Sequence, residues 1–169
     1  EPTLRPFELA PTLVIHAAMK MGKTKSLMTY LDTYFKSELK PPVIRFVSFR
    51  QTFSSNIKSK FEDFVLYSDV KGMLSQQKLI IQVESLHRLD LGIDPPDLLI
   101  LDECESIFEQ FNSGLVRNQS GFATFQWLLK YSKHVICMDA YLGDRTFRTL
   151  QRMRPGFGIS DESAPIIQY

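Results

Sequence analysis

The chain has 169 residues, of which 44% are hydrophobic and 23% charged, and this is the composition of a folded globular domain rather than a disordered or fibrous one. No apolar run is long enough to span a membrane, so no membrane partner is expected. With 20 Lys and Arg against 19 Asp and Glu, the formal net charge is +1, so a nucleic-acid partner has to be argued from motifs.

The cysteines and the start of the chain bear on its location. Cys104 and Cys137 both lie in apolar stretches and form no disulfide framework, and no signal peptide opens the chain. We therefore expect an intracellular protein. The chain starts at Glu1 rather than Met, which favours a fragment of a longer protein.

Short apolar runs alternate with longer segments of helical periodicity, a pattern typical of βαβ units. Strands are expected at residues 13–16, 43–47, 79–83, 98–101 and 134–138, and helical spacing occurs at 27–35, 53–64, 107–111, 122–129 and 147–153. The pattern predicts an α/β domain with a mostly parallel central sheet and helices on both faces. We place this domain at residues 1–154, followed by a linker or tail at 155–169 with one short strand at 166–167.

A candidate phosphate-binding loop, Ala-Ala-Met-Lys-Met-Gly-Lys-Thr, follows the first expected strand at residues 17–24. In such loops, backbone N–H groups at a helix N-terminus surround the phosphates. Gly22 allows close backbone approach, Lys23 reaches the β and γ phosphates, and the Thr24 hydroxyl binds Mg²⁺. The alternative is a simple strand-turn-helix corner with an exposed lysine. The residues expected to bind nucleotide are Ala18, Met19, Lys20, Met21, Gly22, Lys23, Thr24 and Lys25.

A second motif, Leu-Leu-Ile-Leu-Asp-Glu, occupies residues 98–103 and puts two carboxylates at the end of a buried strand. Because burying an isolated carboxylate is costly, such a pair is expected at the solvent edge or facing a cation. Asp102 is predicted to hold Mg²⁺ through water, and Glu103 to orient or deprotonate the water that attacks the γ-phosphate. Helix capping by the same two residues is the alternative and is compatible with catalysis, which the joint occurrence with Gly-Lys-Thr favours.

Three other expected strands also end in small or polar residues. Ligands of open parallel sheets bind outside the carboxyl ends of the strands, so these ends are expected to form one site. Each of them alone is compatible with an ordinary helix cap. The segments are Ser48-Phe49-Arg50, Glu84-Ser85-Leu86-His87-Arg88 and Asp139-Ala140.

With these residues in place, the sequence resembles the superfamily 2 helicases, and among them the replication origin-binding helicases of the herpesvirus type. The resemblance covers residues 12–154 and is most specific at residues 82–88, Gln-Val-Glu-Ser-Leu-His-Arg. It also includes the Ala17 that opens the phosphate loop. Lys20 departs from the family pattern, which has Gly, and Tyr141 stands where a Thr is usual.

The resemblance implies a P-loop NTPase of the RecA-like class, the first of two lobes of an ATP-dependent DNA motor that acts in replication. Gly22, Lys23 and Thr24 are then expected to hold ATP and Mg²⁺, with Asp102 and Glu103 as the hydrolytic pair. The resemblance further assigns Ser48, Phe49, Arg50, Glu84 and Ser85 to the nucleic-acid strand, and Asp139 and Ala140 to the coupling of hydrolysis to lobe movement. A second lobe would supply the arginine finger, and a herpesvirus-like protein would be nuclear.

Alternative functions remain open. One is a degenerate lobe that serves as a nucleotide-binding or interaction module, and a less favoured one is a small P-loop kinase. Arg145, Arg148 and Arg152 share one face of the last helix, which is more simply a solvated face than a contact with DNA or the second lobe. His87 and His134 lack metal-ligand spacing, so no zinc site is expected.

Overall fold

The computed structural model describes residues 12–16, 23–35, 40–92, 94–112, 119–154, 156–157 and 166–168. Its centre is a seven-stranded sheet in the order β3-β4-β2-β5-β6-β1-β7, and every pair of neighbours is parallel. The strands are β1 (Thr12–His16), β2 (Ile44–Ser48), β3 (Val65–Leu66), β4 (Lys78–Gln82), β5 (Leu98–Asp102), β6 (His134–Asp139) and β7 (Ile166–Gln168). The predicted α/β class with a parallel sheet is thereby confirmed.

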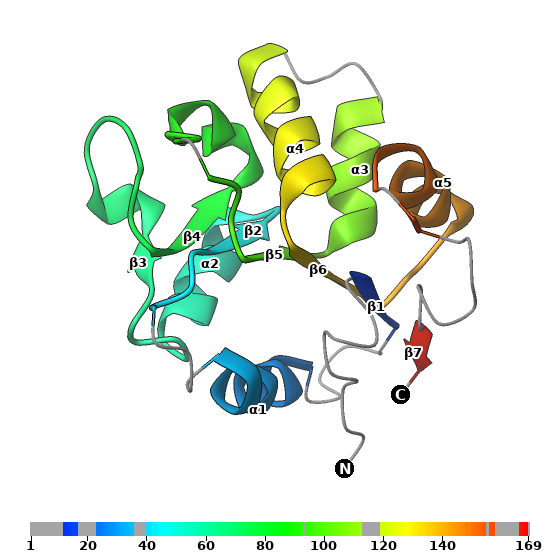
Figure 1. Ribbon diagram of the computed structural model, residues 1–169, viewed down its shortest axis with the longest axis horizontal. Helices are drawn as coiled ribbons and strands as arrows, with labels where there is room; N and C mark the ends of the chain where they lie inside the picture. Colours follow the sequence, from blue (N-terminus) through cyan, green and yellow to red (C-terminus); the bar gives the residue numbers. More distant parts are fainter. Residues whose placement is uncertain are drawn as a thin grey trace.

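Helices cover both faces of the sheet (Figure 1). The α-helices are α1 (Lys23–Phe35), α2 (Gln51–Lys58), α3 (Cys104–Asn112), α4 (Gln119–Tyr131) and α5 (Asp144–Met153), and two 3₁₀ helices are η1 (Tyr67–Asp69) and η2 (Val83–Arg88). Figure 1 shows α3, α4 and α5 on one face and α1 on the other. No helix in the described part of the chain is long and apolar enough to cross a membrane.

The central strands are buried on both faces, as expected for a parallel sheet between helices. All residues of β2 and β5 are buried. The pairing register sets His16 of β1 opposite Asp139 of β6, and Asp102 of β5 opposite Met138. The carboxyl ends of β1, β5 and β6 are therefore level with one another, and this edge carries the predicted site.

One expected helix is shorter than its sequence pattern suggested. The apolar spacing from Phe53 to Phe64 predicted a helix, but α2 ends at Lys58, so the second half of this prediction is wrong. The N–H of Phe61 still donates to the Ile57 carbonyl, and a turn then brings Phe61 and Phe64 into the core, where their ring centroids lie 5.4 Å apart. Phe61 and Phe64 are therefore buried from a turn, although their spacing in the sequence is also that of a helix.

The sheet also includes a strand from the predicted tail. The short strand expected at 166–167 is confirmed as β7, which pairs in parallel with β1. Just before the tail, the guanidinium of Arg154 is buried and donates to the Thr12 hydroxyl at 2.9 Å and to the Lys133 carbonyl at 2.8 Å. The boundary after residue 154 stays a prediction.

Candidate functional site

The predicted phosphate loop lies between β1 and α1. β1 ends at His16 and α1 begins at Lys23, so the predicted phosphate loop connects a strand end to a helix start. Thr24 is half-buried and Lys25 exposed. Ala18, Met19, Lys20, Met21 and Gly22, like the side chain of Lys23, lie outside the described residues. A helix that begins directly after such a loop offers its N–H groups to an anion.

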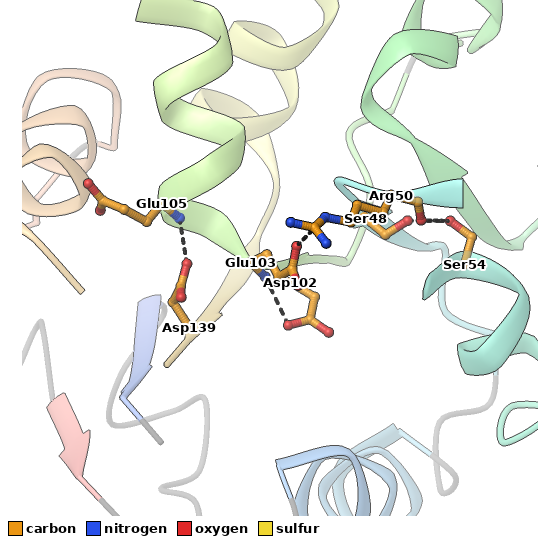
Figure 2. A network of polar contacts seen from close by, with 7 residues as sticks. All are labelled: Ser48, Arg50, Ser54, Asp102, Glu103, Glu105 and Asp139. Carbon is orange, nitrogen blue, oxygen red and sulfur yellow. Dashed lines mark hydrogen bonds and ion pairs between the residues drawn. The ribbon is translucent and has the colours of Figure 1, made fainter. Parts of the chain in front are cut away.

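Asp102 and Glu103 lie where β5 meets α3. Asp102 is the last residue of β5 and is buried, and its Oδ1 accepts the N–H of Glu103 at 2.9 Å. Glu103 has a φ of 52°, a left-handed conformation that costs a non-glycine residue roughly 1 kcal/mol. Figure 2 shows the Glu103 side chain next to Arg50, whereas the Asp102 carboxylate lies away from that arginine. A backbone turn of this kind separates two carboxylates that are adjacent in sequence.

Asp139, at the end of β6, caps helix α3. Its Oδ2 accepts the N–H of Glu105 at 2.9 Å (Figure 2). Its Oδ1 accepts the N–H of Tyr141 at 2.9 Å. The sequence analysis gave Asp102 and Glu103 as the alternative candidates for this cap, and Oδ1 of Asp102 accepts the N–H of Glu103. The carbonyl of Ala140 accepts a hydrogen bond from Nε2 of His16 at 3.0 Å. The predicted coupling residues therefore connect the end of β6 to the end of β1 and to the start of α3.

Glu105 is a residue of the site to which the sequence analysis gave no role. Its Oε2 accepts hydrogen bonds from the Thr146 hydroxyl and, at 3.3 Å, from the N–H of Gly143. Both groups belong to the start of α5. Glu105 thus caps α5 with its side chain while Asp139 caps α3 through the Glu105 backbone. The only feature of the sequence that could have indicated this role is the position of Glu105 as the fourth residue of Asp-Glu-Cys-Glu.

The segment after β2 supplies a cation to the same edge. Ser48 is fully buried and its hydroxyl bonds that of Ser54 in α2, while Phe49 is half-buried against the core. Arg50 has a side chain that is 69% exposed, and its Nε lies 3.9 Å from Oε2 of Glu103. The structure therefore brings a predicted nucleic-acid residue beside a predicted hydrolytic residue.

Glu84 and Ser85 lie farther along the edge, since β2 separates β4 from β5. They belong to η2, where Glu84 is exposed and Ser85 half-buried. The apolar neighbours Val83 and Leu86 are buried, and Arg88 donates to the Gly72 carbonyl at 2.9 Å. Packing and this arginine fix the segment, so its short polar side chains stand at a defined place on the surface.

Cys104, which follows Asp102 and Glu103 in the sequence, has a buried thiol that stays protonated. A hydrogen bond with Cys137, together with burial, raises the pKa of the Cys104 thiol well above its usual range. A thiolate nucleophile needs a lowered pKa. Cys104 therefore packs as a small residue under the site, as the sequence analysis expected.

Comparisons with known proteins identify the family. Residues 5–160 match the family described as "Origin of replication binding protein". A "Putative helicase/primase complex protein" of African swine fever virus (isolate Pig/Kenya/KEN-50/1950) is 52% identical over 158 residues, covering 91% of this chain. The "Replication origin-binding protein" of human herpesvirus 6B (strain Z29) is 39% identical over 139 residues, or 78% of this chain. The chain spans only 15% and 17% of the lengths of these two relatives.

Solved structures agree on the fold. A DEAD box protein from Methanococcus jannaschii superposes with a TM-score of 0.60 at 12% identity, covering 96% of this chain and 47% of that one. The Sulfolobus solfataricus SWI2/SNF2 ATPase core in complex with dsDNA gives a TM-score of 0.55 at 15% identity, covering 76% and 27%. The chain thus has the RecA-like fold of superfamily 2 helicase lobes, and it belongs to the origin of replication binding protein family.

Proposed function

We propose that this chain is the ATP-binding lobe of a DNA replication helicase that hydrolyses ATP to move on or unwind DNA. The observation that carries the proposal is the meeting of Asp102, Glu103 and Asp139 at one sheet edge, level with the end of β1 and beside Arg50. Membership of the origin-binding family supports it. A second RecA-like lobe of the same protein is part of the proposal.

Nucleotide binding is assigned to residues 18–25, with Thr24 and Asp102 as the residues that would hold Mg²⁺. Their donor set fits this ion, because a hydroxyl and a carboxylate are hard oxygen ligands and Mg²⁺ keeps several waters. No cluster of three or more His, Cys, Asp or Glu residues that could hold a metal occurs in the described part of the chain. A bound Mg²⁺ supplies charge neutralisation at the phosphates.

Glu103 is the proposed general base for the water that attacks the γ-phosphate. Its left-handed backbone and its separation from the Asp102 carboxylate support a role distinct from metal binding. Arg50 places a cation beside the Glu103 carboxylate, with its Nε 3.9 Å from Oε2 of Glu103. Lys23 is assigned to the β and γ phosphates.

Nucleic-acid contact is assigned to Phe49, Arg50, Glu84 and Ser85. Arg50 is the strongest of these candidates because its guanidinium is exposed and suits a phosphate. Ser48 was expected to contact the strand, but its side chain is buried against Ser54, so we assign it the positioning of α2. Asp139 and Ala140 are proposed to couple hydrolysis to lobe movement.

The test is ATP hydrolysis by the full-length protein, measured with and without single-stranded DNA. Lys23→Ala and Glu103→Gln are each expected to lower DNA-stimulated turnover by about 10²-fold or more. Glu103→Gln should retain ATP binding, because only the base is lost. Glu62→Gln is the matched control, since Glu62 is an exposed carboxylate after α2.

Three outcomes would contradict the proposal. Unchanged turnover in both variants would remove the assigned roles. Failure of the wild-type protein to bind ATP·Mg²⁺ at millimolar concentration would favour the degenerate lobe, and turnover that requires a small acceptor and ignores DNA would favour a kinase.

A further inference from the structure

A groove of about 660 Å³ runs between the ends of α4 and α5, and we call it the α4–α5 groove. α4 contributes its last two turns, and α5 contributes its last turn and the residues after it. The lining residues are Gln126, Trp127, Lys130, Tyr131, Gln151, Arg152, Met153, Arg154, Gly156 and Phe157. It belongs to neither the nucleotide loop nor the carboxylate cluster.

The groove lies at the opposite edge of the sheet from the carboxylates. α4 ends at Tyr131, and β6 begins three residues later at His134 and reaches the carboxylate edge at Asp139. At about 3.3 Å per strand residue, the length of β6 separates the two edges by roughly 17 Å. A ligand in the groove therefore makes no contact with Asp102 or Glu103.

The floor of the groove is apolar and aromatic. Trp127 and Met153 are half-buried, and Tyr131 is 51% exposed, which is unusual for a large ring. The centroids of Trp127 and Tyr131 are 6.0 Å apart with the rings tilted by 51°, and Lys130 Nζ lies 5.1 Å from the Tyr131 centroid. Trp, Tyr and Arg side chains around an apolar centre are typical of protein interfaces.

All ionisable side chains that line the groove, apart from the Tyr131 phenol, are cations. Arg154 is committed to backbone carbonyls and the Thr12 hydroxyl, which leaves Lys130 and Arg152 at the rim. Arg152 also lines an adjoining cavity of about 410 Å³ with Arg145, Arg148, Thr149 and Asn112. The sequence of α4 contains no acidic residue, and that of α5 contains only Asp144 at its start. In a chain of net charge +1, this outer face is locally basic.

We propose that the α4–α5 groove docks an acidic amphipathic segment of a protein partner. Its apolar side chains would cover Trp127, Tyr131 and Met153, and its carboxylates would pair with Lys130 and Arg152. A protein is favoured over a single nucleic-acid strand because base stacking needs an open ring face, whereas Lys130 covers one face of Tyr131 and Trp127 packs against this ring. This proposal is independent of ATP hydrolysis.

The test is fluorescence anisotropy with the full chain and a labelled helical peptide that has Leu and Phe on one face and Glu on the other. Tyr131→Ala and Arg152→Glu are each expected to weaken binding about tenfold. Met73→Ala and Lys71→Glu are the matched controls, because Met73 is 61% exposed and Lys71 is an exposed cation, both outside the groove. Thermal unfolding confirms that each variant is folded.

The proposal predicts that the same peptide with Lys in place of Glu does not bind. Equal binding of both peptides, no binding of the acidic one at millimolar concentration, or equal loss in the control variants would overturn it. It would also be overturned if the groove variants leave peptide binding intact but abolish binding of a single-stranded oligonucleotide, or abolish self-association in sedimentation. In those cases the occupant is a nucleic acid or a second copy of the chain.

Discussion

The two edges of the parallel sheet hold their charged side chains in different ways. At the amino edge, Asp97 accepts the Lys133 ammonium at 2.8 Å and the Val43 N–H at 2.7 Å. Arg45 and Arg154 donate to backbone carbonyls, and burial lowers the pKa of Arg45 to about 10. The two arginines are buried and held by hydrogen bonds within the fold, whereas the Lys133 side chain is 62% exposed.

The carboxyl edge combines two buried carboxylates with an ion pair that lies partly in solvent. Asp102 and Asp139 accept backbone N–H groups, which orient their carboxylates, and Arg50 lies 3.9 Å from Glu103 with most of its side chain in solvent. An exposed ion pair of this length contributes little to stability. Asp102 and Asp139 are as buried as Arg45 and Arg154, each 6% exposed, so the two edges differ in the Arg50–Glu103 pair, whose charges are accessible to a ligand.

The largest expected effect is on Glu103, where replacement should strongly lower activity while stability depends on which residue replaces it. Glu103→Gly and Glu103→Ala are both expected to lower ATP turnover by about 10² to 10⁴-fold, since both lack the proposed base. Glu103→Gly should nevertheless be more stable than Glu103→Ala by about 1 kcal/mol, because glycine adopts the positive φ of this position without strain. Urea unfolding and turnover assays measure the two effects. Equal stability of the two variants would contradict the strain at Glu103.

Replacing Arg154 is expected to lower stability and to leave turnover unchanged. Arg154→Met leaves the Thr12 hydroxyl and the Lys133 carbonyl without their donor, so the free energy of unfolding is expected to fall by about 2–3 kcal/mol. Turnover per folded molecule should not change. Arg148→Met is the control, because Arg148 is an exposed arginine on α5, the helix that ends just before Arg154, and it is expected to stay within about 0.5 kcal/mol of the wild type. A large loss of activity in folded Arg154→Met would contradict the view that charges at the amino edge serve only the stability of the fold.

Asp139 serves the fold and also lies at the functional edge, since it orients helix α3 there. Asp139→Ala removes two accepted hydrogen bonds and should cost about 1 kcal/mol of stability. Asp139→Asn keeps one acceptor oxygen and should cost less. Thermal unfolding of both variants is the measurement, and equal losses would show that the carboxylate charge, not its hydrogen bonds, matters.

The smallest expected effect is a pH dependence at the amino edge. Burial and the nearby Arg154 lower the pKa of His134 below its usual 6.5. The unfolded chain then binds a proton more readily than the folded one, so stability is full above about pH 6.5 and falls as the pH drops towards the folded pKa. His134→Gln should reduce this fall in urea titrations, and the exposed His87→Gln should not. An identical pH profile in both variants would exclude His134 as its source.

Much of the fold could be predicted because its strands are unusually simple in sequence. A run such as Leu-Leu-Ile-Leu at 98–101 is buried on both faces and has few alternatives to a central parallel strand. The two-residue β3 was missed because such a short strand has no periodicity of its own. Phe61 and Phe64 misled the helix prediction because burial, not helical geometry, set their spacing.

The site was predicted as a set of residue types at one edge, and this grouping is what the register of β1, β5 and β6 provides. What could not be predicted are the contacts across elements. The Ser48–Ser54 bond turns an expected surface residue inward, and the cap of α5 by Glu105 joins positions 41 residues apart. Such pairings depend on how helices pack on the sheet, about which local sequence carries no information.

The sequential caps at the end of β6 have a mechanical consequence. Asp139 holds the first turn of α3, and Glu105 in that turn holds the start of α5, so one strand end fixes two helices. A shift of this strand end would carry α3 and α5 with it as one body. A displacement that begins at the carboxylates would then also move the outer face of α5, which carries Arg148 and Arg152.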